Sequence, residues 1–115
     1  AAIFQLAVCY YERASGIDYD TGMADRAIRY LKTFLRRFSE SEYRPEAEEM
    51  LNELENRKAR KAFDIADYYE EKDSPRGALI YYREVARKYP NTEYAERART
   101  RIAAIEENYR EGEDQ

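Results

Sequence analysis

Residues able to carry out catalytic chemistry are scarce in this sequence. Its 115 residues include no His and a single Cys, Cys9. This removes His-based acid–base catalysis, Ser-His and Cys-His nucleophilic pairs, and any Cys/His zinc site. Cys9 lies on the inward stripe of a predicted helix, where we expect a small buried side chain. The sequence therefore predicts no catalytic residue and no cofactor.

Carboxylates are the remaining candidates for chemistry. Glu46, Glu48 and Glu49 are close neighbours, as are Asp18 and Asp20. The Glu run begins a predicted helix, where the helix dipole favours negative charge without any functional role. A glycosidase needs two carboxylates facing across a cleft. We expect no metal site, and a carbohydrate-acting helical domain stays an alternative that facing carboxylates of perturbed pKa would support.

The composition favours a helical protein of one domain. Hydrophobic residues make up 43% of the chain and charged residues 38%, with only 4 Gly and 3 Pro, too few for a turn-rich β fold. The net charge of −4 argues against nucleic acid as a partner. No apolar run approaches the length of about 20 residues that a transmembrane helix needs. Ala1 to Gln5 contain neither an initiator Met nor a basic leader, so we expect a piece of a longer protein.

The chain contains an internal repeat. When Ala27 is placed on Ala78, a gap-free comparison also matches Tyr30 with Tyr81 and continues to Leu54 and Ile105. Upstream, Tyr10-Tyr11-Glu12 matches Tyr68-Tyr69-Glu70 at an offset seven residues larger. We therefore expect an insertion in the first copy, within residues 14–25.

Apolar periodicity predicts five helices. Pro45 and Pro75 suit the first turns of the third and fourth helices, with Ser74 as a candidate cap, and Asn91 or Thr92 suits the start of the fifth. The predicted fold is all-α: a tetratricopeptide-repeat-like α-solenoid with two helical hairpins and a capping helix, forming one domain over residues 1–110. Residues 111–115 form an acidic tail that we expect to be disordered. The apolar stripe of the second helix runs from Ala24 to Phe38, with Asp20 or Thr21 as a candidate cap. The other predicted helices cover roughly residues 1–14, 45–72, 75–89 and 92–110.

Two resemblances narrow this fold. Ala66 and Tyr69, followed by Ala78, Tyr82 and Pro90, resemble the tetratricopeptide repeat, whose small residues let two antiparallel helices approach closely. Over a longer span, the chain resembles the C-terminal half of the BamD (YfiO/ComL) family. The segments that support this are Asp18-Tyr19-Asp20, residues 36–43, residues 66–72 and Lys88-Tyr89-Pro90-Asn91-Thr92.

The BamD resemblance implies a function. That family consists of periplasmic lipoproteins of the outer-membrane β-barrel assembly machinery. It implies a non-enzymatic protein–protein interaction scaffold at the periplasmic face of the outer membrane. The implied partner is a barrel-assembly subunit or an extended peptide of an outer-membrane protein. Membrane attachment is expected only through a lipidated N-terminal Cys that this chain lacks, since Cys9 lies in mid-helix.

The resemblance also indicates where a partner binds. The matching residues are Tyr68, Glu71 and Lys72, at the end of the third helix. Lys72 is expected in the last turn of that helix, and Arg76 follows after a short Pro turn, so two cations are expected at one rigid corner beside an aromatic ring. We predict partner binding at Tyr68, Glu71, Lys72 and Arg76.

Other exposed features leave alternatives open. We expect Tyr11, Tyr69 and Tyr82 to be packed, and Tyr10, Tyr68 and Tyr81 to be either contact residues or merely solvated. Arg57, Lys58, Arg60 and Lys61 form a basic patch that either meets an acidic partner or is simply a solvated face. A periplasmic coordinator of the Tol-Pal or cell-division type is the alternative function, together with a generic repeat scaffold. Coordinators tend to have a Gly-Asp-Tyr turn inside each hairpin, which the corresponding turns here do not contain.

Overall fold

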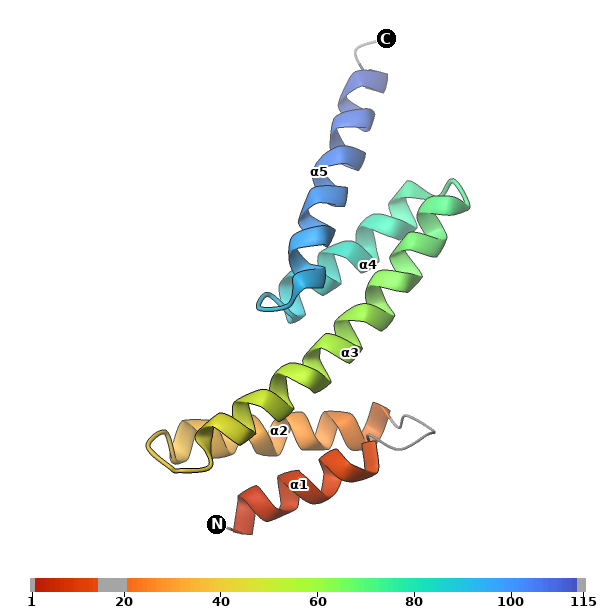
Figure 1. Cartoon of the computed structure of the whole chain (residues 1–115). Coiled ribbons are helices and arrows are strands. Elements are labelled where there is room, and N and C mark those ends of the chain that lie inside the picture. The colour runs from red at the N-terminus through yellow and green to blue at the C-terminus, as the bar shows by residue number, and fades with distance from the viewer. Residues whose placement is uncertain (1, 15–20, 114–115) are drawn as a thin grey trace. The chain divides into compact units, whose positions relative to one another are not determined.

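The part of the chain that the structure describes is built from helices. The computed structural model describes residues 2–14 and 21–113, and five α-helices follow one another within them (Figure 1). This confirms the predicted all-α fold with two hairpins and a closing helix. The helices are α1 (Ala2–Ala14), α2 (Thr21–Arg37), α3 (Arg44–Glu71), α4 (Pro75–Lys88) and α5 (Glu93–Glu113).

The last helix is longer than expected. Glu111, Gly112 and Glu113 belong to α5, although the sequence placed them in a disordered tail. A single Gly near a helix end costs only about 1 kcal/mol, and no Pro follows to stop the helix. Asp114 and Gln115 lie outside the described residues, and so do residues 15–20, where the predicted insertion falls.

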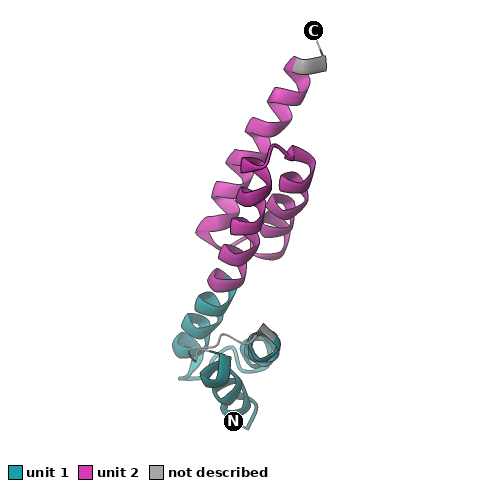
Figure 2. Cartoon of the chain, turned by 90° about the vertical axis from the view of Figure 1, so that its right-hand side faces the viewer, with its two compact units in different colours: residues 1–55 teal, residues 56–115 magenta. Residues whose placement is uncertain are grey.

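The chain forms two compact units, unit 1 (residues 1–55) and unit 2 (residues 56–115) (Figure 2). The N-terminal part of α3 belongs to unit 1 and its C-terminal part to unit 2. Each unit has its own apolar core. That residues 1–110 act as a single domain stays a prediction.

In unit 1, α1 and α2 form an antiparallel hairpin against the start of α3 (Figure 1). Alanines at the contact permit close approach of the helices. The ring centroids of Phe4 and Phe34 lie 5.0 Å apart and fill the space at one end of the hairpin. The buried core consists of Phe4, Ala7, Ala14, Ala24, Ala27, Leu31, Phe34, Ala47 and Leu54.

In unit 2, the second part of α3 packs with α4 and α5. Tyr82 is fully buried, and its ring meets Phe63 edge-on with 5.3 Å between centroids. Small side chains again lie where helices meet, as predicted for Ala66 and Ala78, which are both fully buried. The core consists of Ala59, Phe63, Ala66, Ala78, Leu79, Tyr82, Val85, Ala98 and Ile105.

Burial confirms the main repeat offset and corrects the upstream one. Downstream of Ala27 the core pairs are buried in both copies, as with Ala47 and Ala98. Outer pairs such as Phe38 and Tyr89 differ in exposure. Upstream, the equivalent buried residues are Phe4 with Phe63 and Ala7 with Ala66. Their spacing places Tyr10 on Tyr69, not on Tyr68, so the offset is eight residues larger than downstream rather than seven.

Ring stacking supports the corrected offset. Tyr10 stacks on Tyr30 with 5.6 Å between ring centroids. Tyr69 stacks on Tyr81 at the same separation. Tyr30 and Tyr81 are themselves equivalent in the repeat, so the two stacked pairs occupy the same position in each copy.

The predicted caps of α5 and α4 differ in their hydrogen bonds. Thr92 caps α5, because its hydroxyl oxygen accepts the N–H of Ala95 at 3.2 Å and its hydroxyl donates to the carbonyl of Tyr89 at 2.8 Å. Ser74 occupies the cap position of α4 but forms no side-chain capping hydrogen bond. Pro75 is the first residue of α4, as predicted.

Cys9 is exposed, so the prediction that it is a buried core residue is wrong. The buried stripe of α1 includes Phe4, Ala7 and Ala14. Cys9 lies two residues after Ala7, which is about 200° around a helix with 3.6 residues per turn. Its side chain therefore points to solvent.

Candidate functional site

The predicted contact residues meet at the turn between α3 and α4, which we call the α3–α4 corner (Tyr68, Glu71, Lys72 and Arg76). Successive backbone N–H groups fold back onto the end of α3. Lys72 donates to the carbonyl of Tyr68 at 3.1 Å, and Ser74 donates to the carbonyl of Tyr69 at 2.9 Å. Asp73 adopts a positive φ of 60°, a conformation that Asp tolerates better than most residues. The result is a tight, hydrogen-bonded turn.

Lys72 lies immediately after α3, which ends at Glu71, and not in the last turn as expected. Its ammonium group lies 5.7 Å from the centroid of the Tyr68 ring. This cation–π contact combines a charge and an aromatic face in one exposed feature. Tyr68 is 55% exposed.

The charge of the corner is mixed. Lys72, Arg76 and Glu71 are all exposed, and so is Asp73 between them. No ion pair joins these four side chains to any other side chain in the described part of unit 2. Together with Asp73, the corner thus presents two cations and two anions close to one another, and a partner would need to match both signs.

The Tyr69 ring packs between the exposed Tyr68 of the corner and Tyr81 of α4. It packs edge-on against Tyr68 and stacks on Tyr81. A Cβ added at Gly77 would lie 3.1 Å from this ring and 3.2 Å from the hydroxyl of Ser74. Gly77 therefore allows α4 to approach the Tyr69 ring closely.

A polar network beside the corner joins α3 to α4 and α5. The Glu70 carboxylate accepts hydrogen bonds from two nitrogens of the Arg101 guanidinium, Nε at 3.1 Å and Nη2. It also accepts a hydrogen bond from the Tyr82 hydroxyl at 2.8 Å. The hydrogen bonds from Arg101 lower the pKa of Glu70 below its ordinary value, and the bond from Tyr82 contributes in the same direction. Burial raises the pKa of Tyr82, and Glu70 raises it further.

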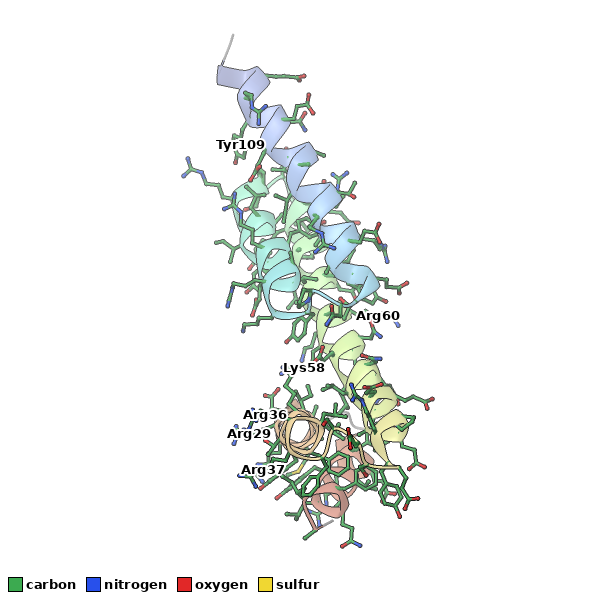
Figure 3. All side chains as sticks on the ribbon, turned by 90° about the vertical axis from the view of Figure 1, so that its left-hand side faces the viewer. Arg29, Arg36, Arg37, Lys58, Arg60 and Tyr109 are labelled. Atoms are coloured by element: carbon green, nitrogen blue, oxygen red, sulfur yellow. The ribbon has the colours of Figure 1, made fainter. Side chains whose placement is uncertain are left out.

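The sequence did not predict this network. Glu70 and Arg101 are 31 positions apart, on helices whose relative rotation periodicity alone does not specify. Beside it lies a cavity of about 360 Å³ between the corner and the second half of α5. Tyr109, one of its lining residues, projects from α5 (Figure 3). The cavity is lined by Glu70, Asp73, Pro75, Ile105, Asn108 and Tyr109.

The tyrosine predictions are confirmed for some residues only. Tyr82 is fully buried, and Tyr11 and Tyr69 are half-buried. Of the three contact candidates, only Tyr68 is exposed, because Tyr10 and Tyr81 are half-buried in stacked pairs.

The predicted basic patch on α3 is not uniformly solvated. Lys58 is half-buried, and this burial lowers the pKa of its ammonium group, with nearby Lys88 lowering it further. Arg60 projects from α3 (Figure 3) and lies 4.0 Å from Asp64. Arg57 and Lys61 are exposed.

The candidate carboxylate clusters do not form a metal site in the described residues. No group of three or more His, Cys, Asp or Glu side chains there is arranged to hold an ion. Asp18 and Asp20 lie outside the described residues. No described helix is long and apolar enough to span a bilayer.

These features define a helical repeat protein of the tetratricopeptide type whose candidate site is a surface corner. The chain belongs to the YfiO family of outer membrane lipoproteins, whose family model matches residues 1–114. The sequence-based suspicion of the BamD (YfiO/ComL) family is thereby confirmed. No curated protein matches the chain in sequence.

Proposed function

We propose that this protein is a non-enzymatic interaction scaffold, a BamD-like component of outer-membrane β-barrel assembly. The observation that carries this proposal is the match of residues 1–114 to a family of outer membrane lipoproteins. Stacked helical hairpins support it, because such repeats offer extended surfaces for binding other proteins. The proposed location is the periplasmic face of the outer membrane, with attachment through a lipidated N-terminus outside this sequence.

The proposed contact site for the barrel-assembly subunit is the α3–α4 corner. Interface hot spots are enriched in Tyr and Arg. Tyr68 and Arg76 are both exposed here, on either side of a hydrogen-bonded turn. A turn held in this way loses little conformational freedom on binding, which favours affinity.

Calorimetric titration of the purified barrel-assembly subunit with this protein tests both the function and the site. We expect the wild-type chain to bind, and the double variant Lys72→Glu/Arg76→Glu to lose more than about 1 kcal/mol of binding free energy at moderate salt. Helix content and melting temperature should stay nearly unchanged, since both side chains are exposed.

The matched control reverses two exposed arginines on α5, Arg99→Glu/Arg110→Glu, and so changes the net charge equally. It should bind like the wild type. Equal affinity of both double variants and the wild type would remove the corner from the proposal. Absence of binding by the wild type would contradict the proposed function itself.

A further inference from the structure

Helix α2 carries an unusual concentration of positive charge. It contains five basic residues and one acidic residue, whereas the whole chain has a net charge of −4. Every one of the five basic side chains is exposed. The basic residues are Arg26, Arg29, Lys32, Arg36 and Arg37.

Two of these cations have partners inside unit 1. The Lys32 ammonium lies 3.6 Å from the Glu55 carboxylate. The Arg26 guanidinium lies 5.8 Å from the centroid of the Tyr10 ring. Contacts within unit 1 therefore partly explain the presence of Lys32 and Arg26.

The other three form what we call the basic stripe (Arg29, Arg36 and Arg37). No ion pair engages them in the part of the chain that the structure describes. They project from the same side of α2 (Figure 3). Because Arg29 and Arg37 are eight residues apart, the stripe is about 12 Å long at 1.5 Å per residue.

Two partly exposed aromatic side chains lie at the C-terminal end of α2, on its core-facing side rather than on the side of Arg29 and Arg36. Phe38 follows Arg37 directly and is 43% exposed, and Tyr43 is 40% exposed. Both rings are positioned by packing, Phe38 on Phe34 and Tyr43 on Phe4. Glu40 and Glu42 are exposed beyond the helix end, so the cationic character ends with α2.

We propose that the basic stripe binds the anionic phospholipid headgroups of a bilayer surface. The chain belongs to a family of outer membrane lipoproteins, which supports a position beside a bilayer, and the proposal rests on the location proposed above. Arg29 and Arg36, seven residues and about two turns apart, share one face of α2, and Arg37 extends this face on one flank, so all three guanidinium groups can reach one plane of headgroup phosphates. This contact involves unit 1 and is separate from the corner that we propose for the barrel-assembly subunit.

Vesicle co-sedimentation of the 115-residue chain tests the proposal. The probe is a mixed phosphatidylglycerol–phosphatidylcholine vesicle, with pure phosphatidylcholine as the neutral comparison. Each basic residue near an anionic surface raises partitioning by about fivefold. We therefore expect Arg29→Gln/Arg36→Gln/Arg37→Gln to lower the partition coefficient on the anionic vesicles by at least about twentyfold.

The control variant Arg87→Gln/Arg99→Gln/Arg110→Gln removes the same number of exposed positive charges from unit 2. It should partition within about twofold of the wild type. Equal losses in the two triple variants, or no preference of the wild type for anionic vesicles, would overturn the proposal. Binding to soluble polyglutamate without binding to vesicles would overturn it in favour of an acidic protein segment.

A second readout reports on the stripe directly. The chain has no Trp, so Thr33→Trp introduces a unique fluorophore on the face of α2 between Arg29 and Arg37. Its emission should shift to shorter wavelength with anionic vesicles and stay unchanged with neutral ones. An unchanged emission with anionic vesicles would contradict contact at the basic stripe.

Discussion

Glu70 is the shared acceptor of the polar network beside the corner. It accepts hydrogen bonds from Arg101 on α5 and from Tyr82 on α4, so one carboxylate joins three helices of unit 2. A charge-assisted hydrogen bond contributes more than a neutral one, but partial exposure of the Arg101 and Glu70 side chains reduces this contribution.

We predict that Glu70→Gln lowers the free energy of unfolding by about 1 kcal/mol, because the amide cannot accept both guanidinium donors as a carboxylate does. Urea unfolding at neutral pH measures the change. Glu71→Gln is the control, since the neighbouring Glu71 is exposed and in no ion pair in the described part of unit 2. A loss no greater for Glu70→Gln than for Glu71→Gln would contradict the role of the network.

The pH dependence of stability follows from the lowered pKa of Glu70. A carboxyl whose pKa is lower in the folded state than in the unfolded state stabilises the fold above its unfolded pKa. That stabilisation is lost as the pH falls through the folded pKa. We therefore predict that the difference in unfolding free energy between wild type and Glu70→Gln shrinks on acidification below the ordinary Glu pKa. A difference that stays constant or grows in acid would contradict this assignment.

At the scale of elements, apolar periodicity and prolines were enough to predict five helices and most of their ends. The upstream repeat offset was not predictable in the same way. The identical dipeptides Tyr10-Tyr11 and Tyr68-Tyr69 favour one alignment, whereas burial of Phe4 and Phe63 decides for another. Packing determines which of two adjacent tyrosines faces the neighbouring helix, and a short identity cannot show this.

The two helix starts of unit 2 provide a matched test. Thr92→Ala removes a side-chain cap and should lower the free energy of unfolding by about 1 kcal/mol. Ser74→Ala removes a hydroxyl that makes no capping bond, so we expect a change within about 0.5 kcal/mol. Urea unfolding of the two single variants compares them. An equal or larger loss for Ser74→Ala would show that the cap of α5 is not the stabilising feature.

At the scale of the whole molecule, the fold class and the family could be predicted from the sequence, while the geometry of the candidate site could be predicted only in outline. The order of motifs along the chain suffices to suggest the family, and the family model confirms it over residues 1–114. The sequence located the corner through Lys72 and Arg76. It did not show that Glu70 and Arg101 join beside it, because that depends on how helices rotate against one another.

Affinity purification of the full-length parent protein from its native envelope is the measurement that tests the central claim most directly. We predict that a subunit of the β-barrel assembly machinery is recovered with the wild-type protein, and that its recovery falls in the Lys72→Glu/Arg76→Glu variant but not in the Arg99→Glu/Arg110→Glu variant. Recovery of Tol-Pal or cell-division proteins without any barrel-assembly subunit would contradict the proposed function and favour a periplasmic coordinator.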